Sequence, residues 1–135
     1  MLSTDYYLDS SVALRALLGH SPHAAAWLED TIADDRHTVV SSRIIRTEIT
    51  RVLRREGLPV ATRDELVDYL QLVPMDDGIL AEAEAIVPHV KTLDAIHLAA
   101  AIRTGLDLVI VSHDAGMKAV AAIIGYDTFD PVEAD

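Results

Sequence analysis

The segment Lys91-Thr92-Leu93-Asp94-Ala95-Ile96-His97-Leu98-Ala99-Ala100-Ala101 decides the fold of this chain, because it predicts a helix that is apolar on nearly every side. Between Ala95 and Ile102, His97 is the only strongly polar side chain. A helix of this kind is buried in the core of a domain. Asp94 nevertheless stands in its first turn, either because acids stabilise helix N-termini or because its carboxylate is needed there for chemistry.

The composition limits the class of protein. A chain of 135 residues has the length of one ordinary domain, and its 50% content of hydrophobic residues allows a sizeable core. The absence of cysteine excludes disulfides, zinc–thiolate sites and thiol nucleophiles, and it suits a reducing cytoplasm, which is the predicted location. The N-terminus lacks a signal peptide's basic segment, and no apolar run reaches the roughly 20 residues that span a bilayer, so no membrane association is expected.

Strands and helices alternate along the chain, which predicts an α/β fold with a parallel sheet covered by helices on both faces. Strands are expected at residues 4–8, 37–41, 72–75, 108–112 and 126–129. The run 108–112 is continuously apolar, as in a strand covered on both faces, and Pro74 places the third strand at an edge. The whole chain, 1–135, is expected to form one domain with a frayed acidic tail at 130–135.

Residues that cap helices mark where the helices begin. The expected caps or first residues are Ser10 or Ser11, Ser21, Ser41 or Ser42, Thr62, Asp76 or Asp77, Thr92 and Asp114. Serine, threonine and aspartate cap a helix by accepting hydrogen bonds from its free backbone N–H groups. The segment Thr62-Arg63-Asp64-Glu65 has the spacing of a capping box. Gly105 and Gly125 follow helices, as expected of C-terminal caps.

Two aspartates follow strands closely. Asp9 stands after the first strand and Asp114 after the strand 108–112. In open parallel sheets, ligands bind beyond the carboxyl ends of the strands, where the strand order reverses. Each residue also has a purely structural interpretation, because an aspartate at a strand-to-helix turn commonly caps the helix. Both interpretations stay open for each residue taken alone.

Glu48 lies on the apolar side of its predicted helix. It comes four residues after Ile44 and four before Val52, within the buried stripe. A charge in that position is costly unless it is paired or bound to a metal ion. The structural alternative is a salt bridge at the margin of the stripe, with Arg51 or Arg15.

Four carboxylates that face one crevice would repel one another unless a divalent cation lies between them. Oxygen ligands select Mg²⁺ or Mn²⁺. One or two such ions activate water and stabilise an in-line phosphoryl displacement, without a nucleophilic side chain. The formal net charge of −11 excludes indiscriminate binding to nucleic acid, so chemistry on nucleic acid would need such a local site, metal ions or a partner.

The segments around the four acids resemble the motifs of PIN-domain ribonucleases, and most closely those of VapC-type toxins of bacterial toxin–antitoxin pairs. They are Tyr7-Leu8-Asp9-Ser10-Ser11, Arg46-Thr47-Glu48-Ile49, Thr92-Leu93-Asp94-Ala95-Ile96-His97 and Val111-Ser112-His113-Asp114. The resemblance covers nearly the whole chain, and the length and element order agree. Each motif is weak alone, whereas the four in this order and at these distances are specific.

The resemblance implies a three-layer α/β/α fold with a central parallel sheet of about five strands, and metal-dependent endonucleolytic cleavage of RNA. The residues it assigns to catalysis and to binding Mg²⁺ or Mn²⁺ are the four acids Asp9, Glu48, Asp94 and Asp114. Ser10 and Ser112 fall where the family often has a small hydroxyl residue near the metal. His97, one turn after Asp94, either orients a ligand or a water or is an ordinary packed, hydrogen-bonded histidine.

Two apolar clusters point to binding partners, namely residues 24–28 and the group Leu66, Tyr69 and Leu70. The structural alternative is ordinary core, with Trp27 buried inside. The resemblance implies a homodimer and a VapB-type antitoxin whose segment fills a groove and places an Arg or Lys among the acids, in a heterotetramer or a larger assembly. The net charge of −11 favours a basic partner.

Five arginines crowd the helix that carries Glu48, namely Arg43, Arg46, Arg51, Arg54 and Arg55. Arginine is a good helix former, so a solvated helix face is the structural alternative. The functional interpretation is a phosphate-binding edge beside Glu48, in which Arg43, Arg46 and Arg51 contact RNA.

Other classes of protein share part of this pattern. A haloacid-dehalogenase-like phosphatase also has an aspartate after its first strand, but it needs a second one two residues later, where this chain has Ser11. A catalytically degenerate PIN module that only binds a partner is the non-enzymatic alternative. The presence of all four acids argues against it.

Overall fold

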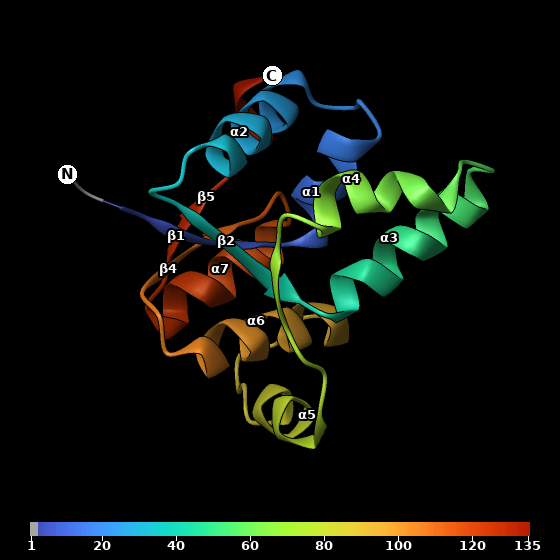
Figure 1. Ribbon diagram of the computed structural model, residues 1–135. Helices are drawn as coiled ribbons and strands as arrows, with labels where there is room; N and C mark the ends of the chain where they lie inside the picture. Colours follow the sequence, from blue (N-terminus) through green and yellow to red (C-terminus); the bar gives the residue numbers. More distant parts are fainter. Residues whose placement is uncertain (1–2) are drawn as a thin grey trace.

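Five parallel strands form one sheet in the computed structural model, which describes residues 3–135 (Figure 1). They are β1 (Asp5–Leu8), β2 (Thr38–Ser42), β3 (Gln71–Val73), β4 (Leu108–Val111) and β5 (Asp127–Phe129). Their order across the sheet is β3-β2-β1-β4-β5, so β1 is central and β3 lies at an edge. The predicted α/β class with a parallel sheet of about five strands is confirmed.

Helices connect these strands. They are α1 (Ser10–Leu17), α2 (Pro22–Ala33), α3 (Ile44–Arg55), α4 (Asp64–Val67), α5 (Asp77–Glu84), α6 (Thr92–Thr104) and α7 (Ala115–Ile124), with the 3₁₀ helices η1 (Val60–Arg63) and η2 (Pro131–Ala134). The apolar helix α6 has its predicted bounds. Gly105 ends it with a φ of +67°, a left-handed conformation that glycine adopts without steric cost. No helix within residues 3–135 is long and apolar enough to cross a membrane.

Helices cover both faces of the sheet, which gives the fold three layers. Leu8 and Val111 point into one apolar cluster, which they share with α1, α2, α3 and α4. Tyr7 and Ile110 point into a second cluster, which they share with α6 and α7. Neighbouring residues of a strand point to opposite faces of the sheet, so both faces must be covered to bury them. Figure 1 shows α2 on one side of the sheet and α6 on the other.

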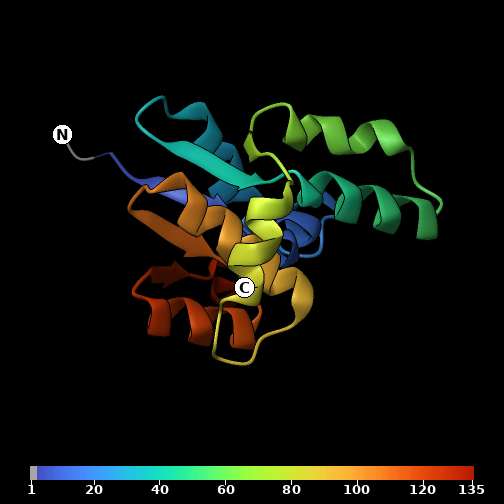
Figure 2. The same cartoon turned by 90° about the horizontal axis from the view of Figure 1, so that it is seen from below.

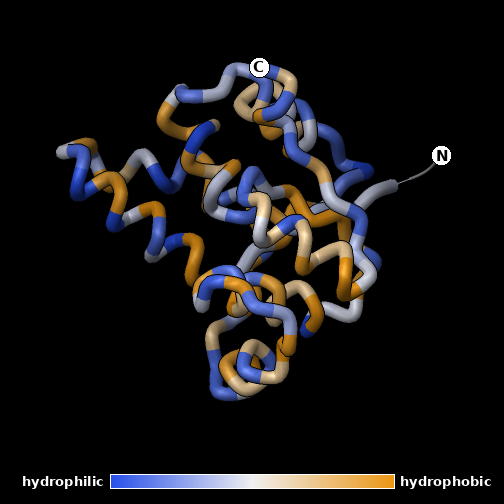
Figure 3. The backbone as a smooth tube through the Cα atoms, turned by 180° about the vertical axis from the view of Figure 1, so that it is seen from behind, coloured by the Kyte–Doolittle hydropathy of each residue, from blue (hydrophilic) through white to orange (hydrophobic). Residues whose placement is uncertain are grey.

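Two elements extend these layers. Helix α5 packs on α6, where Ile79, Ile96 and Ala99 form a third apolar cluster. Helix α3 and the η1–α4 segment form an arm that projects beyond the sheet (Figure 2). Hydrophilic and hydrophobic residues alternate along this arm (Figure 3), as expected of helices with one buried face.

Three helix starts differ from the predicted ones. Helix α3 begins at Ile44, with Arg43 in the cap position, because Ser41 and Ser42 still belong to β2. Helix α1 is capped by Asp9, whose carboxylate accepts a hydrogen bond from the Ser10 N–H, and not by Ser10 or Ser11. The capping box predicted at Thr62 does not form. The chain turns into this segment directly after Pro59, whose fixed φ suits a helix start, and it forms η1 and then the four-residue helix α4.

The acidic tail is ordered, although the sequence predicts that residues 130–135 fray. Lys118 Nζ and His113 Nδ1 each lie 2.9 Å from Oδ2 of Asp130. Burial raises the pKa of Asp130, but the hydrogen bonds from Lys118 and His113 outweigh it and hold the pKa below its usual value. After this anchor the chain forms η2, which packs against α2. Long-range ion pairing therefore orders a segment whose own composition is that of a solvated tail.

Candidate active site

The candidate site lies at the carboxyl ends of β1 and β4, where the strand order reverses. The Asp9 N–H donates to the Val111 carbonyl over 3.0 Å, so the β1–β4 ladder continues into the site. Asp9 caps α1, and Asp114 caps α7 by accepting the Met117 N–H. The structural interpretation of both aspartates is therefore correct. The same two caps bring both carboxylates to one edge of the sheet.

Hydroxyl groups surround Asp9, which is only 1% exposed. Its Oδ2 accepts hydrogen bonds from Ser11 Oγ at 2.7 Å and from Ser112 Oγ at 2.8 Å. A buried carboxylate needs such donors to replace its hydration. Ser112 Oγ also accepts the N–H of Asp114 at 3.1 Å. Ser112 therefore links Asp9 to Asp114.

Glu48 points inward from α3, as its place in the apolar stripe predicts. Its Oε1 lies 2.6 Å from Nε2 of His97, and its Oε2 accepts a hydrogen bond from Ser10 Oγ at 2.9 Å. Within residues 3–135, the alternative salt bridge with Arg51 or Arg15 is not formed. Glu48 is instead held by a hydroxyl group and an imidazole.

His97 connects Glu48 to the interior of the fold. The imidazole is fully buried, and its Nδ1 lies 2.6 Å from the Tyr7 hydroxyl. An ionised carboxylate only accepts hydrogen bonds, so Nε2 carries the proton that faces Glu48. Burial lowers the pKa of His97, but the hydrogen bond to Glu48 and the charge of Asp9 outweigh it and raise this pKa above its ordinary value. The packed, hydrogen-bonded histidine that the sequence allows is thus also a residue that orients Glu48.

Asp94 in the first turn of α6 shares the electrostatic environment of the other aspartates. Burial raises its pKa to about 6, and the negative charges of Asp9 and Asp114 act in the same direction, against the opposing effects of His97 and Lys91. Charges shift a pKa in this way only at short range. Asp9 and Asp114 therefore act electrostatically on Asp94, and a cation at this edge of the sheet would stabilise the ionised form of Asp94.

The donor set of the site suits a hard divalent cation. Carboxylate and hydroxyl oxygens are the preferred ligands of Mg²⁺ and Mn²⁺. Within residues 3–135, no three His, Asp or Glu side chains are already gathered around a point that could hold an ion. Mg²⁺ keeps several of its waters and needs only one or two protein carboxylates. The chemistry of the residues present therefore fits the ion, and Asp94 and Asp114 are the partly exposed aspartates of the set.

The arginines predicted to border Glu48 line a separate groove. Arg46 comes two residues before Glu48, which places it on the opposite side of a helix with 3.6 residues per turn. It lines this groove together with Arg43, Arg51 and Arg63. None of the four acids lines this groove.

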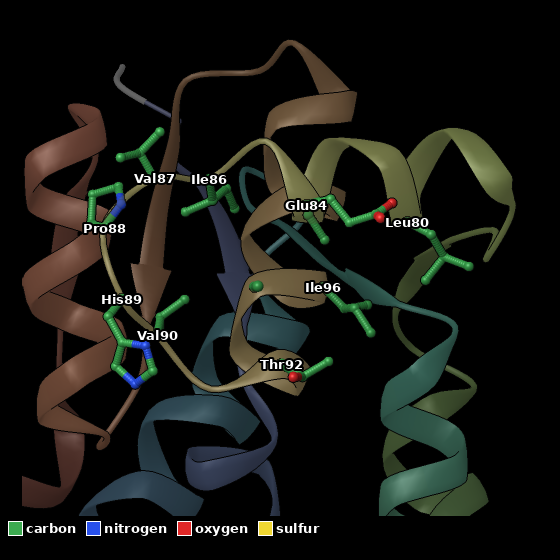
Figure 4. Close-up of a pocket in the computed structure, with 11 residues that line it drawn as sticks. Leu80, Glu84, Ile86, Val87, Pro88, His89, Val90, Thr92 and Ile96 are labelled. Carbon is green, nitrogen blue, oxygen red and sulfur yellow. The ribbon is translucent and has the colours of Figure 1, made fainter.

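A larger hollow of about 570 Å³ lies between α5, residues 85–91 and α6 (Figure 4). Leu80, Ile86 and Val90 belong to its mainly apolar lining. None of the four acids lines it. This hollow is therefore not the candidate active site.

A model of the PIN domain family matches residues 6–123, a range that contains all four acids. This chain belongs to the PIN domain family. Ribonuclease VapC46 of Mycobacterium tuberculosis is 35% identical over 129 residues, which cover 93% of this chain and 96% of that protein. Ribonuclease VapC47 of the same species is 32% identical over 132 residues, with the same two coverages. The resemblance to VapC-type PIN proteins that the sequence motifs indicate is confirmed.

Solved structures share the fold of this PIN domain. A toxin–antitoxin complex from Klebsiella pneumoniae contains a chain with a TM-score of 0.69 and 18% identity, over 93% of this chain and 97% of that one. VapBC2 from Rickettsia felis, bound to a DNA fragment from its promoter, gives a TM-score of 0.70 and 12% identity, over 94% and 98%. At these identities the likeness establishes the fold alone, which is the predicted three-layer PIN-like α/β/α arrangement.

Three residues of the PIN domain's site are not among those predicted from its sequence. Tyr7 bonds to His97, and Ser11 bonds to Asp9. Lys91, 80% exposed, has its Nζ 3.7 Å from Oδ2 of Asp114. The position of Ser11, two residues after Asp9, could have indicated its contact with that carboxylate. For Tyr7, the sequence predicts only a core residue of a strand. For Lys91, no sequence pattern predicts a contact with an aspartate that is distant in the chain.

Proposed function

We propose that this PIN domain is a metal-dependent endoribonuclease that acts in the cytoplasm as the VapC-type toxin of a toxin–antitoxin pair. The proposal is carried by the geometry at the sheet edge, where Ser112 Oγ bonds both Asp9 and the N–H of Asp114, and His97 Nε2 lies 2.6 Å from Glu48 and 3.9 Å from Asp9. The inward-facing Glu48 lies beside them, through its contacts with Ser10 and His97. Two relatives that match most of the chain are named ribonucleases, which supports RNA as the substrate.

In this proposal the four acids hold Mg²⁺ or Mn²⁺, which supplies activation of water and neutralises charge on the phosphoryl oxygens. Ser11 and Ser112 fix the orientation of Asp9, and His97 fixes that of Glu48. Lys91 places a positive charge at the mouth of the site, where it attracts the scissile phosphate. No side chain would act as a nucleophile. Water would attack the phosphorus in line, the P–O bond to the departing ribose oxygen would break, and that oxygen would take up a proton.

The proposed antitoxin site is a groove of about 570 Å³ between α1, α2 and α4. Its lining residues are Ala16, Leu17, Ala25, Leu28, Glu29, Ile32, Ala33, Glu65, Leu66 and Tyr69. The floor is apolar, and Tyr69 is 64% exposed at its margin. Glu29 and Glu65 add negative charge, which favours an amphipathic segment with basic residues. Trp27 is not part of this lining, since its ring packs on Tyr6 at 5.1 Å between centroids.

Two further features of the assembly belong to the proposal. A basic residue of the antitoxin would neutralise the four acids and compete with the metal ion. A second copy of the chain would cover the exposed apolar residues Leu80 and Val87, which line the α5–α6 hollow (Figure 4). A homodimer with two antitoxins forms a heterotetramer, consistent with the two-fold symmetry that most oligomers have.

Cleavage of labelled RNA tests the proposal directly. The wild-type protein should cleave with Mg²⁺ or Mn²⁺ and lose activity in excess chelator. Asp9→Asn and Asp94→Asn should each abolish cleavage, because each removes a charged ligand while keeping the side-chain volume. Glu82→Gln, which changes an acid of α5 that contacts none of the four, is the matched control and should retain activity. Cleavage that persists in chelator or survives both aspartate substitutions would contradict the proposal.

A further inference from the structure

A groove of about 250 Å³ between α3 and η1 is lined almost wholly by cationic and hydroxyl side chains. The lining residues are Arg43, Arg46, Thr47, Thr50, Arg51 and Arg63. The set contains no aromatic and no carboxylate side chain. Guanidinium groups match phosphate oxygens with two parallel hydrogen bonds each. The composition of this groove is therefore that of a site for phosphate groups.

Three of the four arginines in this groove have no carboxylate partner among the residues that the structure describes. Within residues 3–135, Arg43, Arg46 and Arg51 form no ion pair with a carboxylate. The chain carries 22 acidic and only 11 basic residues, so a carboxylate partner is abundant elsewhere on the molecule. Three clustered cations without partners repel one another. An anion bound in the groove would relieve this repulsion.

Arg63 brings the fourth cation to the groove from a different element. Its NH1 donates to Thr50 Oγ1 at 2.9 Å, and its Nε donates to Asp64 at 3.2 Å. The side chain is only 18% exposed, so its guanidinium is held in place before any ligand binds. A guanidinium that is already ordered loses less entropy when it binds a phosphate.

The groove begins near the edge of the sheet where the acids lie. The Arg43 N–H donates to the carbonyl of Val73 at 2.9 Å, which places the start of α3 at the carboxyl ends of β2 and β3. Asp9 and Asp114 lie at the same edge, beyond β1 and β4. From there the groove runs along α3, past Arg46, which lies opposite Glu48, to Arg51, which comes three residues after Glu48 and lies beside it on the helix. A phosphate chain bound along α3 would therefore run towards the sheet edge at which the acids lie.

We infer that this arginine groove binds the ribose–phosphate backbone of the RNA strand on one side of the bond to be cleaved. The inference rests on the proposed ribonuclease function. An acidic peptide is a poorer occupant, because stable peptide docking requires an apolar anchor and the lining offers none. The absence of aromatic rings in the lining means that bases are not stacked there, so the groove contributes affinity without reading sequence.

The test compares two double variants of α3 that remove the same charge. Arg43→Ala with Arg51→Ala removes two exposed cations of the groove, whereas Arg54→Ala with Arg55→Ala removes two exposed cations outside it. Binding of a fluorescent single-stranded RNA is measured by anisotropy in excess EDTA, over a series of salt concentrations. Each phosphate contact in a single strand contributes about 0.7 to the slope of log K against log salt. The groove variant should lose about 1.4 from the slope and bind more weakly at low salt, while the control keeps the wild-type slope.

Arg43→Lys with Arg51→Lys should keep most of the slope, because it preserves both charges. Equal losses in the two alanine variants would overturn the inference, since RNA would then respond to diffuse charge on the helix. Loss of affinity for an acidic peptide with unchanged RNA binding would also overturn it. If wild type binds RNA through the groove but cleaves nothing with Mg²⁺ or Mn²⁺, the proposed function fails and the inference stands. If the protein cleaves RNA with Mg²⁺ or Mn²⁺ but the groove variant binds RNA as wild type does, the inference fails and the proposed function stands.

Discussion

The carboxylate of Glu48 and the imidazole of His97 lie 2.6 Å apart, although 49 residues separate them in the chain. Glu48 comes from the arm helix α3, and His97 comes from the buried helix α6. The other nitrogen of the ring contacts the Tyr7 hydroxyl of the central strand. Three elements thus meet in one hydrogen-bonded chain that ends at Glu48. These hydrogen bonds determine how the Glu48 carboxylate is oriented towards the crevice.

His97 should therefore control the affinity of the site for metal. Replacing a residue that hydrogen-bonds a metal ligand typically costs about 10–100-fold in metal affinity. His97→Ala should weaken Mn²⁺ binding within this range, as measured by calorimetry. Tyr7→Phe keeps the ring of residue 7 and removes only its hydroxyl, so it should have a smaller effect. Wild-type Mn²⁺ affinity in folded His97→Ala would show that His97 serves packing alone.

Asp94→Asn should stabilise the metal-free protein at neutral and higher pH. The folded-state pKa of Asp94 is about 6, above its ordinary value of 3.8. Ionisation of Asp94 therefore costs more in the folded than in the unfolded chain, and stability is lost as the pH rises through about 6. The substitution removes this loss and should raise the melting temperature at pH 8 by roughly 3 °C, as about 1 kcal/mol does in a domain of this size.

Melting curves in EDTA from pH 4 to pH 8 measure this effect. The difference between the variant and wild type should shrink as the pH falls from about 6 and be small near pH 4, close to the pKa of 3.8 that Asp94 has in the unfolded chain. Glu82→Gln serves as the control for loss of one negative charge elsewhere. A stabilisation that is equal at pH 4 and pH 8 would mean that the repulsion among the aspartates is not its cause.

Tyr69→Asp should release the protein from its antitoxin while leaving cleavage intact. Tyr69 is a largely exposed residue at the margin of the α1–α2–α4 groove and contacts none of the four acids. Tyr69 is the one aromatic residue in the lining of this groove, and loss of a tyrosine that anchors an interface commonly costs about 2 kcal/mol or more, so antitoxin affinity should fall about 30-fold. Inhibition titrations with the operon-encoded partner would measure the change. Unaltered inhibition would exclude this groove as the docking site.

Val87→Asp should dissociate the proposed homodimer. Val87 is 92% exposed beside the α5–α6 hollow, so the substitution does not disturb the monomer's core. A charge in an apolar interface is costly without a partner. Light scattering should therefore give the mass of a monomer for this variant and of a dimer for wild type. Ile123→Asp, which changes an exposed apolar residue of α7, is the control and should remain dimeric. A dimeric Val87→Asp would place the interface elsewhere.

The sequence alone determined the fold class and the four candidate acids. Alternation of strands and helices predicted the parallel sheet, and the apolar run around His97 predicted the bounds of α6. Strand ends singled out Asp9 and Asp114, and the apolar stripe of α3 singled out Glu48. These features are local, because periodicity and capping depend on residues within a few positions of one another.

Only the tertiary structure decided which distant residues meet. The contacts of His97 with Glu48 and Tyr7, and the ordering of the tail through Asp130 and Lys118, join elements far apart in the chain. The position of Arg63 beside the α3 arginines likewise depends on how η1 packs against α3. Such contacts follow from the register of the strands and the packing of the helices on them. Neither can be read from the period of a single segment, so the surroundings of each acid become visible only when the chain is folded.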